Sequence, residues 1–133
     1  MMVNDSAAKA EVEAAFAAYE KALTTNDVAG LDGFFHEAAT SVRYGATENL
    51  YGYAAIQAFR ASRSAVGLAR RLEQTQITTY GADFATAATL FRRDSLPGKV
   101  GRQMQTWVRF SQGWKIVAAH VSIIDDPGAL ARS

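Results

Sequence analysis

Tyr19 is a polar residue at a position where the sequence predicts a buried surface. At about 100° per residue along a helix, Tyr19 projects on the same side as Val12, Phe16 and Leu23 in the predicted helix over residues 5–25. A tyrosine in such a stripe either satisfies its hydroxyl within the core or presents it at the rim of a cavity. In the second case the hydroxyl could donate a proton or bind an anion.

Arg43 is the second residue that could do chemistry, in a predicted strand over residues 40–44. Val42 and Tyr44 share one face of that strand, while Ser41 and Arg43 share the other. An arginine with such neighbours is either an edge charge in water or a buried guanidinium that binds a carboxylate through two hydrogen bonds. The strand alone leaves both interpretations open.

A third group of polar residues lies in the predicted strand over residues 100–110. One face of that strand carries Gln103, Gln105, Trp107 and Arg109. Amides and an indole that line a pocket would explain such polarity, and so would a solvated edge. The segment therefore predicts either a pocket wall or an exposed strand.

The pairing of this strand with the predicted strand over residues 114–124 decides which side chains join it. A two-residue turn at residues 112–113 would place Gln105 opposite His120, whereas a three-residue turn would shift every pair. His120 is then either an acid–base group in the pocket or a histidine satisfied within the sheet. The predicted substrate-binding residues are Gln105, Trp107, His120 and Ser122.

Composition argues against several other chemistries. The chain has no cysteine, which excludes disulfides, thiolate nucleophiles and cysteine metal sites. Its two histidines, His36 and His120, lie far apart in the sequence, so we expect no bound metal. A buried carboxylate base is not predicted, because Asp83 and Asp94 fall at turns and Glu73 at the start of a strand. The formal net charge of +1 gives no strong field for a nucleic acid or an anionic membrane.

The elements that would position these residues run from helices to strands. Helices are predicted over residues 5–25, 28–35 and 53–62, and strands over residues 40–44, 49–51, 72–80, 84–93, 100–110 and 114–124. Short turns between the last four strands favour antiparallel pairing. We therefore expect an α+β fold with helices on one face of a curved antiparallel sheet. A chain of 133 residues suits one domain, here 1–133, with an ordered core over about 5–124 and loose ends.

Two further expectations concern assembly and location. The predicted strand over residues 114–124 is apolar on both faces, whereas an antiparallel sheet usually leaves one face in water. We expect a homodimer that covers the second face, the alternative being a tail or loop. No apolar run approaches the ~20 residues that span a bilayer, and the N-terminus lacks a signal-peptide core. A cytoplasmic protein that binds no membrane is therefore expected.

The order of elements, the chain length and the stretch Trp114–Ser122 (WKIVAAHVS) resemble the NTF2-like, or SnoaL-like, superfamily. That resemblance implies a cone, in which the curved sheet wraps around the N-terminal helices and encloses a pocket. It also implies a dimer. Many unrelated activities share this fold, so it does not by itself predict a reaction.

A closer resemblance, to the AtzH/HpxZ-like family, covers residues 11–122. It is carried by the segments Arg43–Gly45, Glu48–Gly52, Ala65–Arg70, Ile77–Gly81 and Gly101–Phe110. Members of this family accompany amidohydrolases in cyanuric-acid and oxalurate breakdown, and the AtzH branch is associated with decarboxylation of urea-1,3-dicarboxylate to allophanate. The family's proposed catalytic tyrosine and arginine match Tyr19 and Arg43.

The resemblance implies a cofactor-free decarboxylase whose partner is a small anionic substrate. Arg43 would bind a carboxylate, preferably the one that stays, and Tyr19 would protonate the urea nitrogen. The alternative is a non-catalytic accessory protein that binds an amidohydrolase or its product. A third option, another lyase or isomerase, would need His120 as its base. Around the third helix Arg60, Arg63, Arg70 and Arg71 are expected to form a solvated rim, from which one or two could steer an anionic ligand inward.

Overall fold

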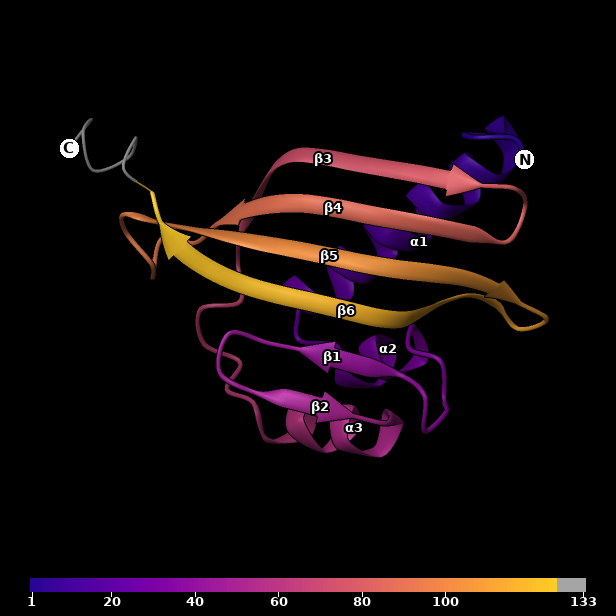
Figure 1. The fold of residues 1–133 in the computed structure, drawn as a ribbon. Coiled ribbons are helices and arrows are strands. Elements are labelled where there is room, and N and C mark those ends of the chain that lie inside the picture. Colours follow the sequence, from indigo (N-terminus) through magenta and orange to yellow (C-terminus); the bar gives the residue numbers. More distant parts are fainter. Residues whose placement is uncertain (127–133) are drawn as a thin grey trace.

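A computed structural model describes residues 1–126 of the chain, and its helices begin at recognisable sequence signals (Figure 1). The helices of this part are α1 (Ser6–Thr24), α2 (Val28–Gly33) and α3 (Tyr53–Ser62). Asp5 caps α1 by accepting a hydrogen bond from the Ala8 amide at 3.0 Å, and Asp27 caps α2 by accepting one from the Gly30 amide at 3.0 Å. Gly52 precedes α3 with a φ of +88°, which glycine adopts at little cost. The three predicted helices are confirmed.

The six predicted strands are also confirmed. They are β1 (Val42–Tyr44), β2 (Asn49–Tyr51), β3 (Arg71–Tyr80), β4 (Phe84–Arg92), β5 (Lys99–Phe110) and β6 (Gly113–Asp125), in the sheet order β2-β1-β6-β5-β4-β3. Neighbouring strands are antiparallel except β1 and β6, which are parallel. The wholly antiparallel sheet of the prediction is wrong at this pair. The chain between β1 and β6 contains β2, α3, β3, β4 and β5. Because this connection is long, no short turn forces β6 to run antiparallel to β1.

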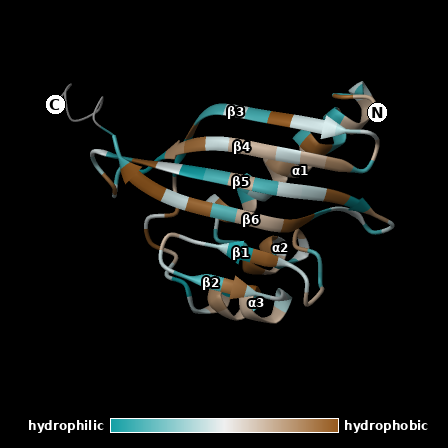
Figure 2. Ribbon diagram, in the orientation of Figure 1, coloured by the Kyte–Doolittle hydropathy of each residue, from teal (hydrophilic) through white to brown (hydrophobic). Residues whose placement is uncertain are grey.

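The helices cover one face of the sheet, which we call the inner face. Figure 1 shows α1 behind the long strands and α3 beside β2, on a curved sheet whose two edges do not meet. The predicted α+β architecture, with helices on one side of a curved sheet, is therefore confirmed. Figure 2 shows hydrophilic stretches along β5 although this strand lies in the middle of the sheet. None of the helices among the described residues is long and apolar enough to cross a membrane.

The hairpin of β5 and β6 differs from the predicted pairing. Phe110 pairs with Gly113, so the turn lies at residues 111–112, one position earlier than the predicted two-residue turn. Along the hairpin, Trp107 pairs with Ile116 but Thr106 pairs with Ala118. The intervening Val117 has no partner, which makes it the extra residue of a β-bulge.

The bulge reverses which side chains of β6 face the helices. Gln105 lies opposite Ala119 instead of His120, and His120 lies opposite Met104. His120 is exposed, as is Met104, on the outer face of the sheet. The strict alternation assumed for residues 114–124 fails here, because one inserted residue moves every later side chain to the other face.

The N-terminal residues, expected to be loose, instead bond to the edge strand. Val3 forms a β-bridge with Tyr80, and the Asn4 amide donates to the Thr79 carbonyl at 2.9 Å. The Asn4 side chain in turn accepts a hydrogen bond from the Thr79 amide at 3.0 Å. These contacts cover part of the open edge of β3. Of the C-terminal end predicted to be loose, residues 127–133 lie outside the described part of the chain.

Candidate functional site

A cavity of about 160 Å³ lies between the inner face of the sheet and the helices. It is lined by Tyr19, Leu23, Arg43, Ala46, Glu48, Phe59, Arg63, Leu68, Arg70, Arg93, Gln103, Val121 and Ile123. A cavity of about 150 Å³ admits a molecule of the size of benzene, and pockets for drug-sized ligands start at about 300 Å³. The cavity therefore suits a small molecule.

Tyr19 borders the cavity from the middle of α1 and packs on the opposite side against aromatic rings. Its ring meets those of Phe34, Phe35 and Trp107 edge to face, with centroids 6.0, 6.5 and 6.4 Å away. The residue is 5% exposed. Among the described residues, its hydroxyl has no hydrogen-bond partner. Three rings thus hold the phenol in place, and its oxygen is available to a ligand.

Arg43 borders the same cavity from the inner face of β1. Its Nη1 donates to Glu48 Oε1 at 2.8 Å, and its guanidinium lies 5.5 Å from the centroid of the Phe59 ring. Thr47 also donates to Glu48, through its hydroxyl at 2.6 Å and its amide at 3.2 Å. Burial alone would raise the pKa of Glu48, but the hydrogen bonds from Thr47 and Arg43 outweigh it and lower that pKa. The charge of Arg43 is therefore offset by an ionised carboxylate.

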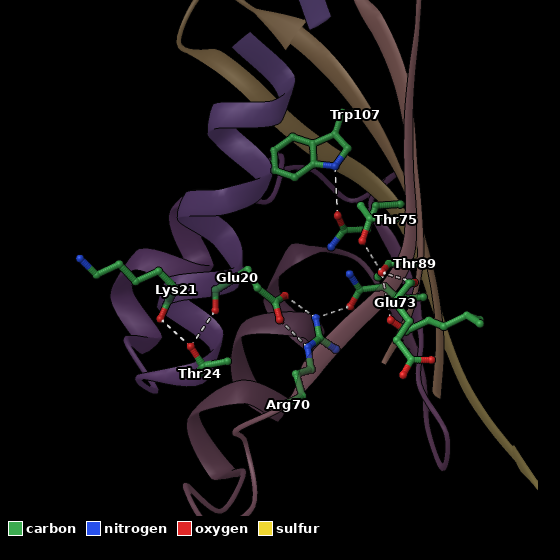
Figure 3. Close-up of polar contacts among 11 residues, drawn as sticks. Glu20, Lys21, Thr24, Arg70, Glu73, Thr75, Thr89 and Trp107 are labelled. Carbon is green, nitrogen blue, oxygen red and sulfur yellow. Dashed lines mark hydrogen bonds and ion pairs between the residues drawn. The ribbon is translucent and has the colours of Figure 1, made fainter. Parts of the chain in front are cut away.

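Arg70 is held by a second carboxylate, as Figure 3 shows for its contact with Glu20 on α1. Arg70 Nε donates to Glu20 Oε2 at 2.7 Å, and Nη2 donates to Glu20 Oε1 at 2.5 Å. The same Nη2 donates to Gln103 Oε1 at 3.2 Å. This two-point contact fixes the guanidinium plane and neutralises its charge.

Arg63 and Arg93 also line the cavity, but they have no carboxylate partner among residues 1–126. Two buried nitrogens of Arg63, Nε and Nη2, and the Nε of Arg93 have no hydrogen-bond partner there. Burial lowers the pKa of Arg63, and the guanidinium groups of Arg60 and Arg43 lower it further. Burial also lowers the pKa of Arg93, together with Arg70 and Arg63. The cavity thus carries positive charge that the surrounding protein does not offset.

The other predicted site residues divide between the two faces of the sheet. Gln105 and Trp107 are buried on the inner face, where the Trp107 indole donates to Gln105 Oε1 at 3.0 Å, but neither lines the cavity. His120 and Ser122 lie on the outer face, where Ser122 accepts a hydrogen bond from Arg102 Nε at 3.1 Å. The prediction that His120 and Ser122 line the pocket is wrong, because the bulge in β6 turns them outward.

The four arginines near α3 do not form the expected common rim. Arg63 and Arg70 enter the cavity, while Arg60 is buried and donates to Asp32 at 3.0 Å. Only Arg71 is a solvated side chain, paired at 3.0 Å with an exposed carboxylate.

The residues of the cavity that the sequence did not predict include Glu48, Arg93 and Phe59. Of these, Glu48 carried a usable signal, because it lies five residues after Arg43 across a tight turn between two short strands. Arg93 comes directly after β4, so the alternation of a strand does not predict its direction. Phe59 lies in α3, and an apolar residue in a helix gives no signal for a cavity that binds an anion.

A larger depression, of about 600 Å³, is a weaker candidate. Three of its lining cations are already paired within the described residues: Arg71 with Asp94, Arg92 with Glu73 and Asp126, and Lys99 with Asp125. The unpaired Arg93 borders both this depression and the smaller cavity, so the depression offers a ligand little uncompensated charge of its own. Within residues 1–126 no group of three histidine or carboxylate side chains could hold a metal ion.

The fold defines the structural class. It is an NTF2-like fold: the chain superposes on an NTF2-like protein of unknown function from Pseudomonas putida KT2440 with a TM-score of 0.75, at 21% identity over 89% of this chain and 87% of that one. The chain belongs to the AtzH-like family, whose model matches residues 1–127. No curated protein matches it.

Two solved structures are similar along nearly their whole length. A protein of unknown function from Pectobacterium atrosepticum SCRI1043 is 56% identical, with a TM-score of 0.90 over 92% of this chain and 95% of that one. A cystatin-like fold protein from Burkholderia xenovorans LB400 is 47% identical, with a TM-score of 0.92 over 96% and 99%. Neither description names a reaction.

Proposed function

We propose that the protein is a cofactor-free decarboxylase of a small N-carboxylated dicarboxylate, converting urea-1,3-dicarboxylate to allophanate. The observation that supports this most is that Tyr19 and Arg43 border one small cavity of an AtzH-like chain. The cavity suits a small molecule, and its excess of guanidinium groups suits an anion. It thus combines a proton donor, a carboxylate-binding group and a matching size.

The reaction needs one bond to break and one proton to move. The C–N bond to the leaving carboxylate breaks, its electron pair stays on the urea nitrogen, and the carboxylate departs as CO2. Tyr19 delivers a proton to that nitrogen, and the phenolate is then reprotonated from water. Because nitrogen accepts the electron pair, the step requires no electron-sink cofactor of the kind that decarboxylation onto carbon often uses.

Arg43 binds and orients the substrate in this proposal. Glu48 and Phe59 hold its guanidinium in place, so the group does not reorganise when the substrate enters. We assign the protein to the cytoplasm, next to an amidohydrolase that forms its substrate.

We also propose that the protein is a homodimer joined through the outer face of the sheet. That face exposes large apolar side chains, including Phe84 at 53% and Met104 at 57%. Exposed apolar surface on a sheet face is a common basis of subunit contact. Sedimentation should give about twice the chain's mass of 14.4 kDa.

The test is a coupled assay, in which a ring-opening enzyme and a carboxybiuret hydrolase supply urea-1,3-dicarboxylate. Allophanate or CO2 is followed with wild-type protein, with Tyr19→Phe and without protein. Acceleration by the wild type, lost in Tyr19→Phe, supports the proposal. Decay at the uncatalysed rate in all three contradicts it and favours a non-catalytic accessory role, which co-purification with an amidohydrolase would then test.

A further inference from the structure

The polar atoms of the cavity that are fully buried and lack a hydrogen-bond partner are all donors. They are Arg63 Nε, Arg63 Nη2, Arg93 Nε and Gln103 Nε2, each buried and without an acceptor among residues 1–126. The side-chain amide of Gln103 is oriented by a hydrogen bond that its Oε1 accepts from Arg70. A set of unpartnered donors is complementary to a ligand group that carries only acceptors, which a carboxylate does.

The charges of the cavity fall into two sets. Glu48 offsets Arg43 at 2.8 Å, and Glu20 offsets Arg70 at 2.5 Å. Arg63 and Arg93 have no such partner in the described chain. Leaving a buried charge unpaired is strongly unfavourable, so these two guanidinium groups gain most from an incoming anion.

Of the unpaired set, Arg93 is held in place before any ligand arrives. The Phe91 ring contacts both Arg70 and Arg93, with the guanidinium carbons 4.6 and 4.9 Å from its centroid. Phe91 in turn lies over Gly101, where an added Cβ would come within 2.0 Å of a ring carbon. The glycine therefore lets the ring lie flat on β5 and support both arginines.

We propose that Arg63 and Arg93 form a second anion subsite, which binds the carboxylate that the substrate keeps, so that the ligand is a dianion. This inference rests on the proposed decarboxylation for the identity of the two carboxylates. A tightly bound charge is stabilised in the ground state, so strong binding of the departing carboxylate would slow its loss. The uncompensated arginines therefore suit the carboxylate that stays, and the departing one lies beside Arg43, whose charge Glu48 offsets.

This proposal differs from the expectation that Arg43 preferably holds the retained carboxylate. That expectation did not include Glu48, which follows β1 and pairs with Arg43.

Binding is tested with glutarate, which does not decarboxylate and has the same five-atom chain between carboxylate oxygens as urea-1,3-dicarboxylate. Glutaramate, in which one carboxylate is an amide, is the matched monoanion. Isothermal titration is run on wild-type protein, Arg63→Met, Arg93→Met and the control Arg71→Met, since Arg71 is 66% exposed and paired outside the cavity. Thermal melts of each variant establish that it is folded.

We expect the wild type to bind glutarate at least about tenfold more tightly than glutaramate. Arg63→Met and Arg93→Met should each weaken glutarate binding by about tenfold or more, and Arg71→Met should leave it unchanged. Equal binding of glutarate and glutaramate, or glutarate binding that survives both cavity substitutions, would overturn the subsite. So would a wild type that binds no glutarate.

Kinetics separate this inference from the decarboxylase proposal. A retained carboxylate is bound equally in ground and transition states, so Arg63→Met should raise KM about tenfold and leave kcat within about twofold. A fall in kcat with unchanged KM would place Arg63 at the departing group and overturn the assignment. If the wild type decarboxylates nothing, the glutarate titration still decides whether the subsite exists.

Discussion

Two halves of the inner face of the sheet, both covered by α1, are built differently. In the half beside the start of α1, which we call the apolar half, Val12 and Phe16 of the helix pack with Trp107 of β5 and with Trp114 and Ile116 of β6. The half beside the end of α1, the polar half, contains Tyr19, Arg43, Arg63, Arg93 and Gln103. The helix α1 and the strands β5 and β6 thus contribute side chains to both halves.

The halves differ in how their polar atoms are satisfied. In the apolar half the indole N–H groups have acceptors: Trp114 donates to Glu11 at 2.9 Å, and Trp107 donates to Gln105 at 3.0 Å. There the unpartnered donor is a neutral amide, the Nε2 of Gln105. In the polar half, arginine nitrogens are buried without acceptors. Close packing with satisfied polar groups stabilises a fold, whereas unsatisfied donors around a cavity favour a ligand. The contrast suggests that stability is concentrated in the first half and binding in the second.

The largest expected effect on the free energy of unfolding is in the apolar half. Phe16 is 5% exposed, so Phe16→Ala should leave a cavity and cost about 3–5 kcal/mol in urea unfolding. Arg93→Met, in the polar half, should cost much less, because it removes an unpaired buried charge. If Arg93→Met destabilises the protein as much as Phe16→Ala, the division between the halves is wrong.

Tyr19 lies at the boundary, and its substitution should separate stability from activity. Tyr19→Phe keeps the three ring contacts and should leave the melting temperature nearly unchanged. If the hydroxyl is the proton donor, kcat should fall by about 10²-fold or more. Matched measurements of melting and turnover on one preparation provide the check, and a fully active Tyr19→Phe would remove this residue from the chemistry.

A smaller effect is expected from enlarging Gly101, because the Phe91 ring that contacts Arg93 lies over this glycine. In Gly101→Ala the new methyl would overlap the Phe91 ring, and such overpacking costs about 1–3 kcal/mol. The displaced ring should also shift Arg93, so glutarate binding should weaken along with stability. Glutarate titration of the variant tests this, and unaltered affinity would show that Phe91 does not position Arg93.

The smallest effect concerns the pH dependence of the Arg43–Glu48 pair. Hydrogen bonds from Thr47 and Arg43 lower the pKa of Glu48 in the folded protein. The ionised Glu48 therefore contributes stability at pH values above its ordinary pKa of 4.5, and this contribution is lost as the pH falls through the lowered pKa of the folded protein. Glu48→Gln should therefore be slightly less stable than wild type above the ordinary pKa, and the two should converge as the pH falls through the lowered pKa of the folded protein. Urea unfolding across that range measures the difference, and a constant difference would mean that the carboxylate charge plays no part.

The fold was largely predictable because its signals are local. Helix caps at Asp5 and Asp27 and close turns between long strands set the elements, and these are the ones observed. The bulge at Val117 was not predictable, since no sequence feature marks an inserted residue in an apolar strand. That single residue accounts for the wrong placement of His120 and Ser122.

The cavity was predictable only in part. Periodicity placed Tyr19 on the core-facing side of its helix but left the direction of Arg43 open, and the fold brings both residues to one cavity. One of the two carboxylates that offset the arginines comes from a distant element: Glu20 is 50 residues from Arg70 in the chain. Which arginines remain unpaired depends on such tertiary contacts. The positions of charged residues in the sequence therefore could not show that Arg63 is unpaired and buried while Arg71 is paired and exposed.

The most direct test of the central claim is steady-state decarboxylation of urea-1,3-dicarboxylate by wild type, Tyr19→Phe and Arg63→Met in parallel. We predict turnover above the uncatalysed rate for wild type, a kcat lowered by about 10²-fold in Tyr19→Phe, and a raised KM with nearly unchanged kcat in Arg63→Met. CO2 release at the uncatalysed rate with wild-type protein would contradict the proposed function.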